Sequence, residues 1–266
     1  ALFGQLLLQE GLWNGKQLIS KEWLKQMMTP HVVRDANDYG YQIWLCEYPG
    51  AWRADGAFGQ YIIIVPQKNM VVVLNQCSRS KGWPERSNIW NTVVKNCINC
   101  AIDVKPSELK ELAQYEESVQ LPVLNGDSVN VATKKYNGKT FTLEKNKLGW
   151  KSIKFDFEKG KTILTVVDKE DKTSNIELGY KKWITSQLAG YPHYSISAQN
   201  RFSGITGPFY TGSCYAWNIG NLEAKIHYVN WITSLKLVFH FDGKDLTIFG
   251  EENFTSKPFT IKAKMK

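Results

Sequence analysis

Two tetrapeptides in this 266-residue sequence place a serine three residues before a lysine, the spacing of a serine nucleophile and its activating base. They are "SRSK", which begins at Ser78, and "SELK", which begins at Ser107. A serine attacks a carbonyl only when a neighbouring base takes its proton. Ser78 follows an expected strand, Ser107 is better explained as the N-cap of a helix, and a lysine-rich chain gives such matches by chance. Neither serine is therefore predicted to be a nucleophile.

Other residues could take part in catalysis or bind a metal, but the sequence lacks the accompanying residues that these functions require. Tyr228 opens a "YVN" tripeptide of the Tyr-x-Asn type, but it lies inside an expected strand. Cys97 and Cys100 have the spacing of zinc ligands, and no second pair or histidine cluster completes the set. The histidines lack a serine in a glycine-flanked turn nearby, and they are His31, His193, His227 and His240. The sequence thus predicts no metal and no cofactor.

A glycine cluster opens the most apolar hairpin of the sequence, "RADGAFGQYIIIVPQKNMVVVLNQ" (53–76). Glycine weakens a strand interior, so at the start of a strand it marks a bend or the close approach of a backbone or ligand. Two explanations are open: a bulge that starts the hairpin, or a backbone N–H that a substrate carbonyl approaches. The second makes the following residues candidates for a substrate wall and an oxyanion donor: Ala54, Asp55, Gly56, Ala57, Gly59 and Gln60.

The composition indicates an ordinary folded protein. The sequence is 43% hydrophobic, 22% charged and 13% aromatic, which is typical of a globular chain with much β-structure. Its net charge is +8, but the basic residues are spread along the chain. Neither nucleic acid nor a membrane span is expected, because no basic block and no run of about 18 apolar residues occurs. The chain begins at Ala1 with residues that already resemble a helix, so we expect a processed or truncated product.

The first 104 residues are expected to form helices around a small sheet. Apolar residues at helical spacing predict a helix near Leu2 that Gly11 ends, and a second helix between the cap Ser20 and Pro30. Further apolar stretches predict three strands and a helix, at 39–47, 60–66, 70–76 and 87–102. The nearly continuous apolar strands indicate a sheet that is covered on both faces.

The remainder is predicted to be a connecting helix over 105–119 and an all-β domain over 120–266. Short alternating runs are separated by turn pairs such as Asn137-Gly138 and Asp242-Gly243, which indicates a barrel or a sandwich. The fold class is thus α+β: a partial antiparallel sheet with flanking helices, followed by an all-β barrel or sandwich. Aromatic residues crowd the middle of this domain and form either its core or a ligand pocket: Trp183, Tyr191, Tyr194, Phe209, Tyr210, Tyr215 and Trp217.

Three stretches occur in a characteristic order: "LFGQLLLQEGLWNGKQLISKEWLKQMMTP", "YGYQIW" and "DGAFGQYIIIVPQKNMVVVLNQ". In this order they resemble the C-terminal part of the serine β-lactamase and penicillin-binding-protein-like hydrolases, including esterases and class C enzymes. In that family a Ser-x-x-Lys, a Tyr-x-Asn and a Lys-Thr-Gly triplet build the site. Ala54-Asp55-Gly56 stands where the triplet would be, but it has no lysine.

The resemblance implies a fragment of a bacterial serine hydrolase that cleaves an ester, an amide or a β-lactam. Its catalytic motifs would lie upstream of Ala1, on an N-terminal segment or a second chain, so this chain would be inactive alone. The β domain resembles the lipocalin-like accessory barrel that follows such hydrolases. Cytoplasmic and exported locations both stay open.

Two other interpretations stay open. In the first, the β domain binds a small molecule, a sugar or a lipid, and the N-terminal part is a non-catalytic scaffold. In the second, the protein is an interaction module that dimerises through exposed apolar strands.

Overall fold

The computed structural model describes residues 1–33, 38–78, 84–98, 101, 103–192, 206–229, 231–253 and 257–266. It divides the chain into two compact units, Ala1–Ala113 and Gln114–Lys266. Helix α4 (Pro106–Ser118) runs across this boundary and buries none of its described side chains. The limits expected from the sequence, 1–104 and 120–266 with a connector over 105–119, remain a prediction.

Unit 1 contains short helices and a four-stranded antiparallel sheet, where the sequence predicts three strands. Sequence reasoning missed β4, because Arg53 and Asp55 interrupt its apolar pattern. Helix α2 begins as predicted, since the Ser20 side chain accepts a hydrogen bond from the Trp23 amide at 3.1 Å. The elements are α1 (Leu2–Leu8), β1 (Leu12–Trp13), β2 (Lys16–Gln17), α2 (Lys21–Met28), β3 (Trp44–Leu45), β4 (Trp52–Gly56), β5 (Gln60–Val65), a 3-10 turn (Pro66–Lys68), β6 (Met70–Leu74), α3 (Pro84–Asn88) and a π-helix (Ile89–Val94).

The apolar run of β5 serves both faces of this sheet. Ile64 packs with Leu7 of α1 and Leu24 of α2 on one face. Ile63 packs with Val94 of the π-helix on the other. Because successive side chains of a strand point to opposite faces, an unbroken apolar strand needs cover on both.

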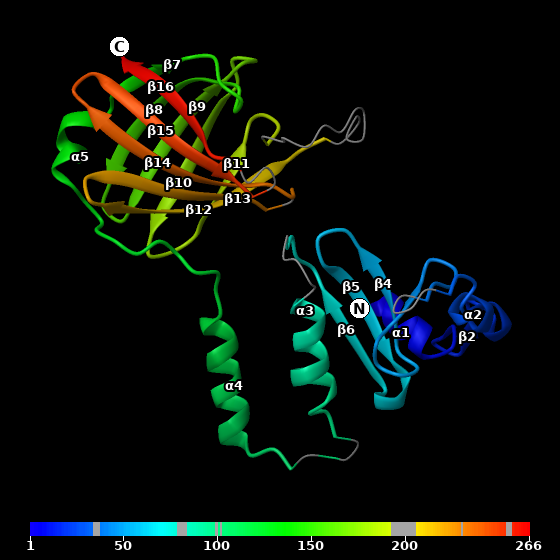
Figure 1. Cartoon of the computed structure of the whole chain (residues 1–266). Helices are drawn as coiled ribbons and strands as arrows, with labels where there is room; N and C mark the ends of the chain where they lie inside the picture. Colours follow the sequence, from blue (N-terminus) through cyan, green and yellow to red (C-terminus); the bar gives the residue numbers. More distant parts are fainter. Residues whose placement is uncertain are drawn as a thin grey trace. The chain divides into compact units, whose positions relative to one another are not determined.

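Unit 2 is a barrel formed from a ten-stranded sheet (Figure 1). Its strands follow in the order β10-β9-β8-β7-β16-β15-β14-β13-β12-β11, and a parallel pairing of β10 with β12 closes the ring. A mixed helix–strand region followed by a β-barrel confirms the coarse prediction of the fold class. The elements are α5 (Val131–Tyr136), β7 (Thr140–Leu143), β8 (Trp150–Glu158), β9 (Lys161–Asp168), β10 (Thr173–Tyr180), β11 (Ile184–Leu188), β12 (Phe209–Asn218), β13 (Asn221–Tyr228), β14 (Ser234–Asp242), β15 (Asp245–Glu252) and β16 (Phe259–Met265).

Alternating side chains fill the barrel. On β14, Leu237 and Phe239 are buried, whereas Lys236 and His240 are exposed. Helix α5 closes one end of the barrel, where the ring of its Tyr136 stacks on a phenylalanine of β14 with centroids 4.6 Å apart. The core of unit 2 is therefore the inside of the ring, and side chains that point outward meet solvent.

Strand β12 departs from this pattern, because it is buried on both faces. Its outward Cys214 and Ala216 pack under Leu124, which belongs to the segment before α5. That segment is held to the strand by two backbone hydrogen bonds, each 2.9 Å long, between Asp127 and Trp217. Burial raises the pKa of the Cys214 thiol, so the thiol stays protonated at neutral pH.

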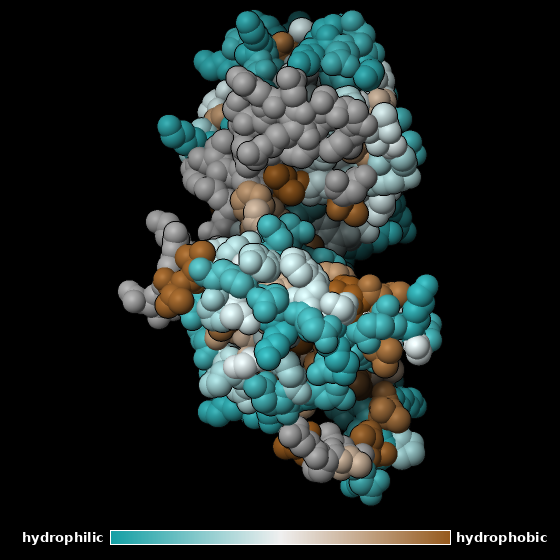
Figure 2. Space-filling view, turned by 90° about the vertical axis from the view of Figure 1, so that its right-hand side faces the viewer, coloured by the Kyte–Doolittle hydropathy of each residue, from teal (hydrophilic) through white to brown (hydrophobic). Residues whose placement is uncertain are grey.

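The surface is largely hydrophilic, and the hydrophobic residues on it occur in separate groups, as the face in Figure 2 shows. On α4, Leu109, Leu112 and Tyr115 are exposed. Within the described residues, the helices are too short or too polar to cross a membrane.

Removal of a ring from the barrel core tests this architecture. Phe155 is fully buried, and its ring lies 5.1 Å from Phe239 and 6.2 Å from Phe141 between centroids. Phe155→Ala should lower the free energy of unfolding of the barrel by about 3–5 kcal/mol, because it removes apolar contact and leaves a cavity. Hydrogen exchange of the β8 and β9 amides measures this change separately from unit 1.

Phe249→Ala is the control, because that ring points outward and is 48% exposed. Its cost should stay below about 1 kcal/mol. Equal losses for the two variants would contradict the assignment of inward and outward faces.

Candidate functional site

The residues predicted to form a substrate wall lie in the β4–β5 hairpin of unit 1. Gly56 pairs with Gln60, and residues 57–59 form the loop. Gly59 has a φ of +82°, and a Cβ there would lie 2.3 Å from Nε2 of Gln76, so the turn itself requires glycine. The shape of the hairpin turn thus explains Gly59, for which the sequence analysis left two explanations open. Whether a substrate also approaches this hairpin stays a prediction for Ala54, Asp55, Gly56, Ala57, Gly59 and Gln60.

Asp55 belongs to a largely buried charge network that sequence reasoning missed. Arg53 is 2% exposed and donates hydrogen bonds to Oδ2 of Asp55 at 2.8 Å and to the Leu45 carbonyl at 2.7 Å. Arg86 of α3 lies 3.8 Å from the same carboxylate and 3.2 Å from Glu47. A buried guanidinium needs such partners, so this network joins β3, β4 and α3.

Cys46, beside this network, is not an activated thiol. Burial raises its pKa to about 11, and the neighbouring Arg53 only partly opposes this shift. Since the thiolate is the reactive form, Cys46 is inert at neutral pH. Cys97 is a half-buried thiol, and Cys100 lies outside the described residues.

The serine motifs do not assemble into a site in the described residues. The Ser78 amide donates to the Phe58 carbonyl at 2.8 Å, and the arginine, serine and lysine of "SRSK" lie outside the described residues. Ser107 is not the N-cap that the sequence suggests, because α4 already begins at Pro106. The Glu108 side chain instead accepts a hydrogen bond from the Lys105 amide at 3.0 Å. Capping by glutamate replaces the expected capping by serine.

The described histidines have ordinary structural surroundings. His31 stacks on a tyrosine ring. His227 lies on the outer face of β13 against Trp183, and burial lowers its pKa. His240 hydrogen-bonds an asparagine of the neighbouring strand at 2.9 Å. His193 lies outside the described residues.

The barrel end next to α5 contains a pocket of ≈ 330 Å³, which we call the α5-end pocket. Its floor includes the aromatic rings of Phe157 and Tyr215. The Tyr215 hydroxyl donates to the Ser128 carbonyl at 2.9 Å, and the Tyr180 hydroxyl donates to the Gly126 carbonyl at 3.0 Å. These bonds hold the loop before α5 over the barrel end. The rim is formed by Ser128, Val129, Thr133, Lys134, Asn137, Glu158 and Lys159.

Tyr215, which lines this pocket, belongs to a row of polar side chains of β12 that point into the barrel. The inward residues of β12 that form this row are Thr211, Ser213, Tyr215 and Trp217, which are at most 2% exposed; we call them the β12 stripe. Each of them carries a hydroxyl or an N–H group. The facing positions of β13 are mainly apolar: Leu222, Ala224, Ile226 and Tyr228.

Three polar atoms of the β12 stripe have no hydrogen-bond partner in the described part of the chain. They are Oγ1 of Thr211, Oγ of Ser213 and Nε1 of Trp217. Tyr215 is satisfied by the loop above it, and burial raises the pKa of its hydroxyl. A buried polar group without a partner costs about 1–3 kcal/mol. Water or a bound molecule can pair these atoms in solution.

At the other end of the barrel, serine side chains bridge β10 and β11. The Ser186 hydroxyl accepts a hydrogen bond from the Glu177 amide at 2.8 Å, and the Ser174 hydroxyl accepts one from the Ala189 amide at 2.9 Å. A pocket of ≈ 50 Å³ lies beside this seam. Ligand sites usually span about 300–1,000 Å³, so the α5-end pocket has a suitable size and this one does not.

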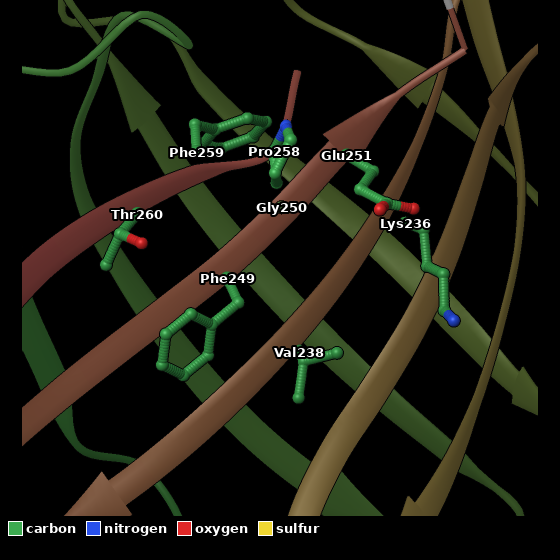
Figure 3. Close-up of a pocket in the computed structure, with 8 residues that line it drawn as sticks. All are labelled: Lys236, Val238, Phe249, Gly250, Glu251, Pro258, Phe259 and Thr260. Carbon is green, nitrogen blue, oxygen red and sulfur yellow. The ribbon is translucent and has the colours of Figure 1, made fainter. Parts of the chain in front are cut away.

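A third hollow, of ≈ 350 Å³, lies on the outer wall over β14, β15 and β16 (Figure 3). Phe249 stands between its cross-strand neighbours Val238 and Thr260, and Lys236 lies opposite Glu251. The charged groups there are exposed to water and need no ligand to satisfy them. The α5-end pocket, which is lined by Tyr215 of the β12 stripe, is therefore the stronger candidate.

Of the aromatic residues that the sequence assigns to either the core or a ligand pocket, some lie in the core and some line a pocket. Phe209, Tyr215 and Trp217 are buried, and Tyr215 also lines the α5-end pocket. Tyr191 is exposed at the smaller pocket, and Tyr194 lies outside the described residues. Sequence reasoning missed the hydroxyls of the stripe, because the residues between them are small or apolar and give the strand no clear alternation of polar and apolar positions.

No family model matches the chain, and no curated protein matches it. Among solved structures, a secretary abundant heat soluble protein from Ramazzottius varieornatus is 12% identical with a TM-score of 0.34, over 55% of this chain and 98% of that one. The fatty-acid-binding protein from Manduca sexta is 10% identical with a TM-score of 0.32, over 49% of this chain and 98% of that one. Similarity at this level carries no argument about function.

These findings overturn the resemblance to serine hydrolases. Neither of these two structures is described as a hydrolase, and no family model places the chain among β-lactamase-like or penicillin-binding-protein-like enzymes. The assignment of the chain to a fragment of an ester- or amide-cleaving serine hydrolase is therefore wrong. The packing of short apolar helices and strands in unit 1 accounts for the stretches on which the resemblance rested.

A valine in place of Thr211 tests whether its hydroxyl lacks a partner. Valine has the same shape, so Thr211→Val should raise the free energy of unfolding of the barrel by about 1 kcal/mol in the ligand-free protein. Hydrogen exchange of the β12 and β13 amides measures the gain. Thr185→Val, at an exposed position of β11, is the matched control and should change little. A loss of stability in Thr211→Val would mean that the hydroxyl is paired.

Proposed function

We propose that the barrel of unit 2 binds a small, largely apolar molecule that enters at the α5-end pocket and lies against the β12 stripe. The observation that carries this proposal is the set of fully buried polar atoms of Thr211, Ser213 and Trp217 that have no partner within the described residues. A folded protein keeps few such atoms, because each one lowers its stability. A site that binds a ligand by hydrogen bonds must present atoms of this kind.

The size of the ring supports the proposal. About eight strands enclose a space that side chains alone just fill, and the ring closed by the β10–β12 pairing has nine. The α5-end pocket has a volume of ≈ 330 Å³ and an aromatic floor of Phe157 and Tyr215. A mostly apolar pocket with a few well-placed polar groups is the usual form of a small-molecule site.

The mouth of the pocket offers an apolar approach. Val129 and Val131, in and beside the loop that covers the barrel end, are 65% and 90% exposed. Exposed valines on a covering loop give an apolar molecule a surface to meet before it reaches the aromatic floor.

The chemistry of the stripe favours binding over catalysis. Its groups are hydroxyls and an indole N–H, which donate and accept hydrogen bonds but provide no base to activate a nucleophile. In this proposal unit 1 is a scaffold, and the ligand site belongs to unit 2.

Blocking the mouth tests the proposal. Nile red, a neutral apolar dye whose fluorescence rises in apolar surroundings, should bind the full chain saturably and with one-to-one stoichiometry. Ser128→Trp should weaken this binding at least about tenfold, because the indole fills the α5-end pocket while the backbone carbonyl of residue 128 still accepts from Tyr215.

Thr185→Trp adds the same side chain to the outer face of β11 and should leave dye binding unchanged. Absence of saturable binding to the unmodified chain, or equal weakening by the two variants, would refute the proposal.

A further inference from the structure

We infer that the molecule in the α5-end pocket is an anion with an apolar body, and that Lys134 and Lys159 bind its anionic group at the rim. A carboxylate, a sulfonate or a phosphate would meet this requirement. The inference rests on the proposed function and specifies the class of ligand. It follows from the charges of the lining, the contacts that fix its walls and the hydrogen-bonding types on its rim.

The lining of the pocket has a surplus of positive charge. Its charged residues are Lys134 in the last turn of α5, Lys159 in the turn between β8 and β9, and Glu158 at the end of β8. Neither lysine has an ion-pair partner within the described residues. The Glu158 carboxylate lies 3.5 Å from Nζ of Lys161, so a cation outside the lining already accompanies it. The pocket therefore attracts anions rather than cations.

The charges next to the lining nearly balance one another. Nζ of Lys154 lies 2.7 Å from Oδ2 of Asp156, and Nζ of Lys161 lies 3.2 Å from Oε2 of Glu177. Lys135 of α5 lies over a tyrosine ring, 5.2 Å from its centroid. These neighbours do not cancel the surplus of the lining.

Hydrogen bonds fix the elements that carry the two lysines of the rim. Oδ1 of Asn137, the residue after α5, accepts a hydrogen bond from the Phe157 amide of β8 at 2.7 Å. The Gly160 carbonyl, in the turn after β8, accepts one from the Tyr180 amide at 3.0 Å. The end of α5 and the turn after β8 are thus tied to the barrel, so the two ammonium groups are carried on a fixed frame. Such preorganisation lowers the cost of binding a ligand between them.

Aromatic rings beneath the rim provide a surface for the apolar body. The half-buried ring of Phe157 packs on Phe155 and Trp217, with centroids 5.9 Å and 5.8 Å apart. Tyr215 contributes its ring, because its hydroxyl already donates to the Ser128 carbonyl at 2.9 Å. An apolar floor below a charged rim matches a molecule that has both parts.

The hydrogen-bonding groups of the rim also favour an anion. Each lysine ammonium group has three N–H donors and no acceptor. Asn137 uses its side-chain oxygen for the Phe157 amide, so its NH₂ group is the part that can bind a ligand. The Ser128 hydroxyl can donate as well. An anionic group only accepts hydrogen bonds and fits these donors, whereas a cation would meet two like charges.

Two dyes with the same apolar body test the role of the anionic group. 1-Anilinonaphthalene-8-sulfonate carries a sulfonate that N-phenyl-1-naphthylamine lacks, and both fluoresce more strongly in apolar surroundings. In titrations of the full chain, the double variant Lys134→Gln/Lys159→Gln, which we call the rim variant, should weaken binding of the sulfonate dye about five- to tenfold, as expected for the loss of two partly exposed ion pairs. The uncharged dye should keep its affinity within about twofold. Lys134→Arg/Lys159→Arg should retain binding of the sulfonate dye, because guanidinium groups keep the charge.

Lys169→Gln/Lys262→Gln is the matched control, because it removes the same charge from two exposed lysines that do not line the α5-end pocket. It should change neither affinity by more than about twofold. Equal weakening of the sulfonate dye by the control and by the rim variant would mean that the dye responds to the net charge of the protein, and would overturn the inference.

Failure of the inference differs from failure of the function on which it rests. If neither of these dyes nor Nile red binds the unmodified chain saturably, the proposed function fails. If Nile red or the uncharged dye binds but the sulfonate dye does not, the ligand class alone is overturned. The same holds if the rim variant, with an unchanged melting temperature, keeps its affinity for the sulfonate dye.

Discussion

Closure of the barrel between β10 and β12 is the constraint on which the interior depends. Gly179 and Tyr180 pair in parallel with Cys214 and Tyr215. A Cβ on Gly179 would lie 2.3 Å from the Lys182 carbonyl oxygen, so a residue without a side chain lets the chain turn back tightly from β10 to β11. The pairing also fixes the register of β12. A slip by one residue would turn the β12 stripe outward and bring Cys214 inside.

The interior combines two kinds of wall. One is made of close-packed rings, including Phe141, Phe155 and Phe239, whose edge-to-face and tilted contacts give the barrel its cohesion. The other is the β12 stripe, which lowers the stability of the empty barrel because three of its buried polar atoms have no partner among the described residues. The aromatic packing stabilises the barrel, and the polar strand lowers its stability. Such a loss of stability is expected where a protein keeps polar atoms available for binding.

Local signals predicted much of the fold. The Ser20 cap, the two-faced apolar run of β5 and the alternation of β14 follow from backbone geometry and burial, so each is visible in the sequence. The short elements β4, β11 and α5 were missed because tertiary contacts decide them. In β4, for example, the buried Arg53 pairs with Asp55 of the same strand, and Asp55 also meets Arg86 of α3, a contact that no local pattern reveals.

The site was harder to predict, for a specific reason. Leu124 covers the outer face of β12, so the outward Cys214 and Ala216 are apolar too, and the strand shows no alternation of polar and apolar residues. The inward hydroxyls are therefore hidden in a run that resembles ordinary core. The glycine cluster at Gly56 and Gly59 was the stronger sequence signal and led to the prediction of a substrate wall, although the shape of a hairpin explains Gly59.

The two serine bridges join β10 to β11 where the sheet has no backbone ladder between these strands in the described residues. A backbone ladder opens cooperatively, since each broken bond strains the next, whereas a serine hydroxyl releases its amide by a single rotation about χ1. Opening the barrel here breaks two side-chain hydrogen bonds in place of a backbone ladder, so we expect β10 and β11 to separate at a lower cost than strands that a ladder joins.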